Sequence, residues 1–255
     1  MSTRESERIP RPDGPASRDA APTAWSSEQA SFTREVPYLL RVPESSEDPS
    51  PAPLVIGLHG MGMSARSFSR RLAPLLESPW ALLAPQGPYP FEMRRPDKMR
   101  IGHAWYTYRG DEEEWFESML VTERYLLELI DGVTSRPDID ASRVFLIGFS
   151  QGCYLGYFLA LRNAARFAGL VSVGGRLKRR FLEPSFAAAR DLPVLILHGS
   201  RDPSVPLEFA ERSRDALTAH QIEATLVQTD SEHDLAPEQV RVAHDWIAER
   251  LGRST

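Results

Sequence analysis

The chain has 255 residues, of which 42% are hydrophobic and 25% charged, a composition typical of a globular protein and unlike that of a wholly disordered one. Thirty lysines and arginines against 35 aspartates and glutamates give a net charge of −5, so the composition lacks the basic excess that is typical of nucleic-acid-binding proteins. Cys153 is the only cysteine, which excludes an internal disulfide and a CxxC metal or redox site.

The first 31 residues are predicted to form a disordered tail, and residues 32–255 a single domain. The tail is rich in proline and charge and has too little apolar surface to offset the entropy of ordering. Its charged residues are followed by no apolar segment, so we expect no secretory signal and a cytoplasmic location. Nowhere does an apolar run approach the roughly 18 residues of a membrane span, so no span is predicted.

From residue 33 onward, short apolar runs alternate with amphipathic segments. Short uninterrupted apolar runs are typical of strands buried on both faces of a parallel sheet, and apolar residues spaced three or four apart predict helices. The predicted strands are 33–42 (at a sheet edge), 54–59, 80–85, 143–148, 170–173, 194–198 and 224–228, and the predicted helices are 64–76 (capped by Ser64), 113–135, 151–165, 206–219 and 236–251. This alternation predicts an α/β fold, with a mostly parallel sheet covered by helices on both faces.

Two segments interrupt the alternation. Residues 86–112 contain many glycines and prolines and are predicted to be a long loop. The aromatic and methionine side chains of this loop suit either the lining of an acyl pocket or simple packing of the loop onto the domain. Residues 175–191 carry the basic residues Lys178, Arg179 and Arg180. This segment is either a small insertion near the functional site or a solvated loop.

One motif points to a nucleophile. The sequence Gly148–Phe149–Ser150–Gln151–Gly152 matches G-x-S-x-G and lies between a predicted strand and a predicted helix. That context places a serine on a sharp turn with its hydroxyl exposed at the end of the strand. The alternative is an ordinary serine that caps the following helix.

A serine nucleophile needs a histidine base, and the base needs a carboxylate to orient it. Enzymes with this motif have the chain order serine, acid, histidine. His233 lies in the loop after the predicted strand 224–228, where it could reach Ser150 at the edge of the sheet. His220 and His244 lie at or within predicted helices and are expected to be surface or packing residues.

Asp202 is the favoured acid because it follows the predicted strand 194–198 at the same edge of the sheet. Asp191, Asp230 and Asp234 remain alternatives, of which Asp234 is the strongest as a charged neighbour of the base. Asp202 could also be an ordinary aspartate of a turn.

An acyl transfer needs two preorganised N–H donors for the oxyanion. The N–H of Gln151, directly after the nucleophile, is one candidate. The other is the N–H of Met61, in the segment His59–Gly60–Met61–Gly62 after an early strand, which could also be a plain glycine-rich turn.

Taken in order, these pieces resemble the phospholipase/carboxylesterase family of α/β-hydrolases, which includes acyl-protein thioesterases and small bacterial carboxylesterases. The resemblance covers residues 33–251 and rests on Leu58–His59–Gly60, on the motif at 148–152, on His198–Gly199 with Asp202 and Val205–Pro206, on His233, and on Ala104–Trp105–Tyr106. It implies an α/β-hydrolase fold with little or no lid. It also implies a nucleophile, acid and base at Ser150, Asp202 and His233, and oxyanion donors at Met61 and Gln151. From their place in the aromatic loop 86–112, Trp105 and Tyr106 are expected to line the substrate pocket. The sequence departs from the family at Glu232, which stands before His233 where the family often has glycine.

The expected function is therefore that of a serine hydrolase that cleaves small carboxylic esters of short to medium acyl chains through an acyl-enzyme. Such chemistry requires no metal or organic cofactor. An acyl-thioesterase or lysophospholipase and a serine peptidase are alternative enzymes. A non-catalytic binding protein on the same scaffold is the alternative outside enzymology.

Overall fold

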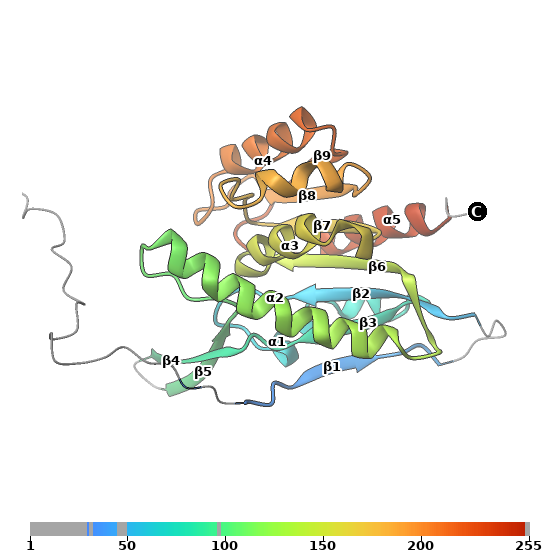
Figure 1. The fold of residues 1–255 in the computed structure, drawn as a ribbon, viewed down its shortest axis with the longest axis horizontal. Helices are drawn as coiled ribbons and strands as arrows, with labels where there is room; N and C mark the ends of the chain where they lie inside the picture. The colour runs from blue at the N-terminus through green and yellow to red at the C-terminus, as the bar shows by residue number, and fades with distance from the viewer. Residues whose placement is uncertain (1–29, 31–32, 45–49, 96–97, 253–255) are drawn as a thin grey trace, which may run out of the picture. The chain divides into compact units, whose positions relative to one another are not determined.

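The structure is a computed structural model that describes residues 30, 33–44, 50–95 and 98–252 (Figure 1). The chain divides after Glu35 into two units, and the described helices and strands all belong to residues 36–255. Apart from Ala30, the predicted disordered tail lies outside the described residues, so its disorder stays a prediction.

Seven strands form one sheet, in the order β1-β3-β2-β6-β7-β8-β9. The strands are β1 (Tyr38–Arg41), β2 (Ala52–Leu58), β3 (Ala81–Pro85), β6 (Ile139–Phe149), β7 (Gly169–Val173), β8 (Val194–Gly199) and β9 (Ala224–Thr229). Only β1 runs antiparallel to its neighbour, and it lies at an edge as predicted. The other pairings are parallel, which confirms the predicted sheet and brings the carboxyl ends of β2 and β6 to β9 to one edge.

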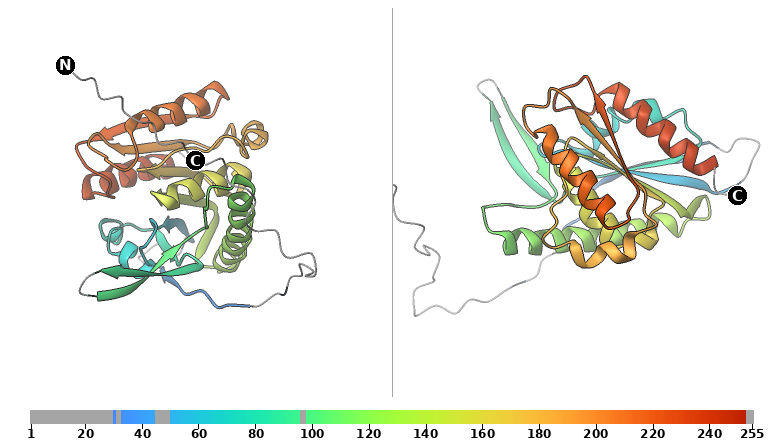
Figure 2. Two further views of the ribbon diagram at one scale, coloured as in Figure 1. Left: turned by 90° about the vertical axis from the view of Figure 1, so that its left-hand side faces the viewer. Right: turned by 90° about the horizontal axis from the view of Figure 1, so that it is seen from above.

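Helices cover both faces of this sheet, as the sequence predicts (Figure 2). One face packs against α2 (Glu112–Thr134), α3 (Gln151–Arg162) and α4 (Leu207–Ala219), and the other against α1 (Ala65–Ser69) and α5 (Pro237–Gly252). Along β2, Leu54 and Ile56 belong to the first core while Val55 belongs to the second, because successive strand side chains point to opposite faces. In the described part of this unit, short 3₁₀ helices also lie at Ala73–Leu75, Ala164–Arg166 and Glu183–Ala189. Within the described ranges, no helix is both long and apolar enough to cross a membrane.

The prediction of a long loop over 86–112 is wrong for about half of these residues. There, β4 (Tyr89–Arg95) and β5 (Lys98–Ala104) form an antiparallel ribbon. Figure 2 shows this ribbon standing apart from the main sheet. Pro90 was one of the signals for a loop. A two-stranded ribbon has two outer edges, where a proline can lie without a lost ladder hydrogen bond.

The helix predicted over 64–76 is also shorter than expected. Its cap is confirmed: the Ser64 hydroxyl accepts a hydrogen bond from the Ser67 N–H at 3.1 Å, and the Ser64 N–H donates to the Ser67 hydroxyl at 2.8 Å. The helix ends at Ser69, and the chain continues as a 3₁₀ turn that contains Pro74. A proline inside an α-helix removes one hydrogen bond and clashes with the carbonyl four residues earlier, which explains the early end.

Candidate active site

Ser150 lies on a strained turn between β6 and α3, in the strand–turn–helix context expected for it. Its φ of 53° is in the region that favours glycine, a conformation that costs about 1–3 kcal/mol and persists only when the surroundings impose it. Two glycines make the turn possible. A Cβ on Gly148 would lie 2.4 Å from the Gly152 carbonyl oxygen, and a Cβ on Gly152 would lie 2.1 Å from the Leu58 carbonyl oxygen.

The structure brings together the three side chains that the sequence singles out as nucleophile, base and acid. His233 Nε2 lies 2.9 Å from Ser150 Oγ, and His233 Nδ1 lies 2.7 Å from Asp202 Oδ2. A carboxylate can only accept, so Nδ1 carries the proton and donates to Asp202. Nε2 is then free to accept a proton from the serine hydroxyl, which is the tautomer that a general base needs.

Asp202 is held as a carboxylate by the turn that carries it. Its side chain is 1% exposed, and its Oδ1 accepts hydrogen bonds from the backbone N–H groups of Ser204 at 2.8 Å and Val205 at 2.9 Å. Burial alone would raise the pKa of Asp202, but the hydrogen bonds from His233, Val205 and Ser204 lower it below its usual value. The group beside His233 is therefore ionised near neutral pH, and both of its oxygens are occupied.

The other candidate acids lie elsewhere. Asp234 forms an ion pair with Arg71 at 2.7 Å, and Asp230 forms one with Arg201 at 2.8 Å. Asp191 is exposed and precedes β8, at the opposite end of the strand from Asp202. Among these carboxylates, Asp202 is the one whose hydrogen bond reaches the His233 ring.

The other candidate bases have structural surroundings. His220 follows α4, and its Nδ1 lies 3.1 Å from the Ala216 carbonyl oxygen. His244 lies on α5 and stacks on Trp80, with ring centroids 4.9 Å apart. Neither contact involves Ser150, which agrees with the expectation that both are packing or surface residues.

The loop after β2 is held by a buried histidine whose proton can be placed. His59 is fully buried, its Nε2 accepts a hydrogen bond from the Gly87 N–H at 2.9 Å, and its Nδ1 lies 2.8 Å from the Gly60 carbonyl oxygen. Because the Gly87 N–H can only donate, the proton is on Nδ1 and the Gly60 carbonyl accepts it. The carbonyl and N–H of a trans peptide point in opposite directions, so this bond turns the Met61 N–H away from His59.

Gln151 begins α3, and its side chain ties the helix to the segment at Trp105. Its Oε1 accepts from the Trp105 N–H at 2.9 Å and its Nε2 donates to the Tyr106 carbonyl oxygen at 3.2 Å, while Trp105 Nε1 donates to the His59 carbonyl oxygen at 2.7 Å. Among the hydrogen bonds of the described residues, none uses the backbone N–H of Met61 or Gln151. Both N–H groups are therefore available to a ligand, at the two places where oxyanion donors are expected.

Trp105 and Tyr106 differ in how they relate to the expected pocket. Trp105 has no exposed surface, so it supports the loop at His59 instead of offering a face to substrate. Tyr106 is partly buried, burial raises the pKa of its hydroxyl, and its ring packs edge-on against Trp115. The supporting roles of His59 and Trp105 were missed from the sequence, although the His-Gly pair directly after a strand marks the position of the first.

We expect His59 to make the folded state lose stability as the pH falls below 6.5. Burial lowers the pKa of His59 from 6.5 to about 4, so the unfolded chain takes up this proton first. The stabilisation of the folded state by neutral His59 is fully present above pH 6.5 and is lost as the pH falls towards 4. Between pH 6.5 and 5 the loss is about 2 kcal/mol, at about 1.4 kcal/mol per pH unit.

The matched variant for this prediction is His59→Gln, which keeps a donor and an acceptor but does not titrate. Urea unfolding at pH 6.5 and pH 5 should show a loss of free energy of unfolding that is smaller in the variant, by the same amount of about 2 kcal/mol. An equal loss in both proteins would show that His59 is not the group responsible.

This chain is similar in sequence to a known family of proteins. A model of the family described as phospholipase/carboxylesterase matches residues 42–251. Acyl-protein thioesterase 1 of Schizosaccharomyces pombe is 28% identical over 168 residues, which cover 62% of this chain and 72% of that protein. Acyl-protein thioesterase 1 of Neurospora crassa is 27% identical over 215 residues, which cover 77% of this chain and 86% of that protein.

Solved structures agree in fold. The carboxylesterase of Bacillus cereus superposes with a TM-score of 0.64 at 18% identity, covering 84% of this chain and 94% of its own. Acyl-protein thioesterase 2 of Zea mays superposes with a TM-score of 0.67 at 21% identity, covering 84% of this chain and 99% of its own. At these identities the likeness concerns the fold, which is that of the α/β-hydrolases.

Proposed function

The chain belongs to the phospholipase/carboxylesterase family, and we propose that it hydrolyses carboxylic esters of short to medium acyl chains through an acyl-enzyme on Ser150. The observation that carries the proposal is the chain of hydrogen bonds from Ser150 through His233 to Asp202. A serine hydroxyl is a weak nucleophile near neutral pH, and this arrangement supplies the base and the carboxylate that activate it.

The proton follows the hydrogen bonds in the proposed mechanism. Ser150 Oγ attacks the acyl carbon while His233 Nε2 takes its proton, and the Asp202 carboxylate stabilises the imidazolium that forms. His233 then gives the proton to the leaving alcohol. In the second half of the reaction, His233 takes a proton from water, the hydroxide attacks the acyl-enzyme, and Ser150 Oγ leaves with the proton returned.

The oxyanion of each tetrahedral intermediate is assigned to the N–H groups of Met61 and Gln151. The His59 bond to the Gly60 carbonyl supports this role, because it holds the Gly60–Met61 peptide in one orientation before substrate binds. A donor fixed in advance costs no reorganisation during the reaction, and one such donor is typically worth about 10²–10³ in rate.

Hydrolysis of acyl-thioesters is the second candidate, favoured by the similarity to two proteins named acyl-protein thioesterase 1. The same residues would act, with a thiol as leaving group. Phenyl butyrate, S-phenyl thiobutyrate and butyranilide share one acyl group, so their kcat/KM values compare ester, thioester and amide directly. If kcat/KM for the thioester is well above that for the ester, the second candidate is favoured. If kcat/KM is highest for the amide, a peptidase is favoured.

The chain length of the acyl group is tested with p-nitrophenyl esters from acetate to palmitate. Each methylene that a pocket buries is worth about 0.8 kcal/mol, which is about fourfold in kcat/KM. We expect kcat/KM to rise from acetate, level off between butyrate and octanoate, and gain nothing further to palmitate. A rise that continues to palmitate would contradict the proposed chain length, and a folded protein that hydrolyses none of the esters would contradict the proposed function.

A further inference from the structure

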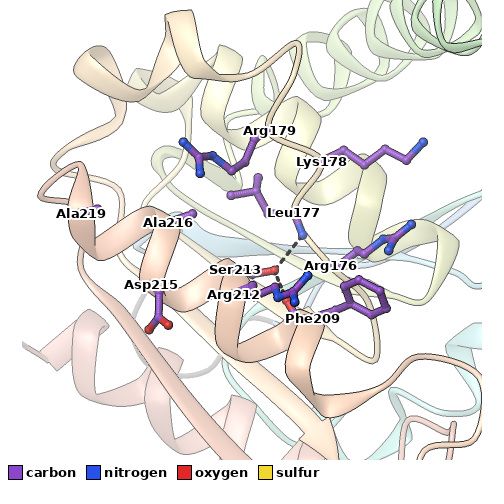
Figure 3. A pocket seen from close by; sticks show the side chains of 10 residues that line it. All are labelled: Arg176, Leu177, Lys178, Arg179, Phe209, Arg212, Ser213, Asp215, Ala216 and Ala219. Carbon is purple, nitrogen blue, oxygen red and sulfur yellow. Dashed lines mark hydrogen bonds between the residues drawn. The ribbon is translucent and has the colours of Figure 1, made fainter.

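A cavity of about 550 Å³ lies between residues 176–179 and helix α4 (Figure 3). This volume is in the range of small-molecule sites. Four cations line it, namely Arg176, Lys178, Arg179 and Arg212, against one carboxylate, Asp215. The cavity is therefore positive although the whole chain has a net charge of −5.

Three of the four cations have a carboxylate partner. The pairs are Lys178 with Glu112, Arg179 with Glu183, and Arg212 with Glu208. Arg176 forms no ion pair with any carboxylate among the described residues. A partly buried cation without a carboxylate is unfavourable unless another group compensates its charge.

The contacts of Arg176 leave much of its hydrogen-bonding edge unused. Its guanidinium lies over the ring of Phe209, 4.2 Å from the ring centroid (Figure 3). Burial raises the pKa of Tyr154, while the positive charge of the nearby Arg176 acts in the opposite direction. A guanidinium has five N–H donors in its plane, and these can bind the paired oxygens of an anion.

Arg176 is also close to the candidate active site along the chain. A Cβ on Gly174 would lie 3.5 Å from the His233 ring, and a Cβ on Gly175 would lie 3.3 Å from the Ser150 carbonyl oxygen. Two trans peptides separate Gly174 from Arg176, so their Cα atoms are at most about 7.6 Å apart. Tyr154, whose pKa the nearby charge of Arg176 acts to lower, lies one helical turn after Ser150 on α3.

We propose that Arg176 binds a carboxylate or phosphate group of the substrate, so that the enzyme prefers anionic esters to neutral ones. The inference rests on the proposed function, because it names the substrate class of the same site. Carboxylates and phosphates share the paired oxygens that a guanidinium binds through parallel N–H groups. The contact with the ring of Phe209 restricts the movement of the guanidinium, which limits the entropy lost when the anion binds.

The test compares anionic with neutral esters in wild type and in Arg176→Gln. For a charge on the acyl side, p-nitrophenyl hemisuccinate is compared with p-nitrophenyl butyrate. For a charge on the alcohol side, 4-acetoxybenzoate and 4-acetoxyphenyl phosphate are compared with phenyl acetate, which also separates carboxylate from phosphate. Rates without enzyme are subtracted, because the hemisuccinate carboxylate can attack its own ester.

We expect Arg176→Gln to lower the ratio of anionic to neutral kcat/KM by about 10- to 100-fold for at least one of these esters, the usual effect of losing a charged hydrogen bond. Arg176→Lys, which keeps the charge but not the planar donors, should restore part of the ratio. The control is Arg180→Gln, in the same segment, where an exposed arginine pairs with Glu113 at 2.9 Å. Its ratio should change by less than about twofold.

Failure of the proposed role of Arg176 can be distinguished from failure of the proposed ester hydrolysis. A ratio unchanged in Arg176→Gln for every pair overturns the role of Arg176, even if the variant is less stable, because a loss of folded protein lowers both rates alike. Wild type that hydrolyses neither neutral nor anionic esters contradicts the proposed function itself.

Discussion

Replacing Ser150 by alanine is expected to lower kcat on p-nitrophenyl butyrate by about 10⁶-fold, the scale of loss when a nucleophile that acts with a base is removed. His233 and the N–H groups of Met61 and Gln151 remain, but no acyl-enzyme can form. The residual rate should still exceed that of water by about 10³–10⁴, since binding and oxyanion stabilisation survive. Steady-state kinetics measures the loss, and mass spectrometry after treatment with a fluorophosphonate should show a covalent adduct on the wild type alone.

Ser200→Ala is the matched control for this prediction. Ser200 is exposed and follows β8, so removal of its hydroxyl should change kcat by less than about twofold. Activity of Ser150→Ala within tenfold of wild type, with both proteins folded, would exclude Ser150 as the nucleophile.

Asp202→Asn is expected to lower kcat by about 10⁴-fold while leaving the fold intact. The backbone N–H groups of Ser204 and Val205 point at Oδ1 of this side chain, so the asparagine must keep its carbonyl oxygen there. Its NH₂ group then faces His233 Nδ1 and forces that nitrogen to accept. The proton moves to Nε2, which can no longer accept the hydroxyl proton of Ser150.

Asp234→Asn makes the same chemical change in the residue next to the base. Asp234 is paired with Arg71, and both side chains are 45% exposed, so the ion pair is worth at most about 1 kcal/mol. We expect kcat of this variant to stay within about threefold of wild type. Equal losses in the two variants, measured by steady-state kinetics at pH 7.5, would mean that Asp202 has no special part in the reaction.

The residue types within each segment explain why some strands and helices could be predicted from the sequence and others could not. The parallel strands are read from apolar runs such as Leu54–Leu58, because a strand buried on both faces has no polar positions to obscure it. The ribbon at 89–104 was missed because its proline and glycine signal a loop, whereas a proline needs no partner at the edge of a ribbon. Helix α1 ends at Ser69 and not at 76 because the ring of Pro74 would clash with the carbonyl of Arg70 in a continued α-helix.

Features that depend on neighbours in the chain could be predicted from the sequence. The turn at Ser150 needs glycines two residues before and after it, and both requirements are local, so a five-residue motif could predict them. The order of serine, acid and histidine along the chain, together with their positions after strands, was enough to favour Asp202 and His233 over their rivals.

Which groups meet in space could not be predicted in the same way, because it depends on how distant segments pack. The hydrogen bond from the Ser150 hydroxyl to His233 spans 83 positions of the chain, and it forms because parallel strands bring their carboxyl ends to one edge of the sheet. The proton position on His59 depends on the Gly87 N–H, 28 positions away, and whether Arg176 has an ion-pair partner among the described residues depends on which carboxylates pack near it. Such pairings are set by packing between distant segments, which no local pattern of residues encodes.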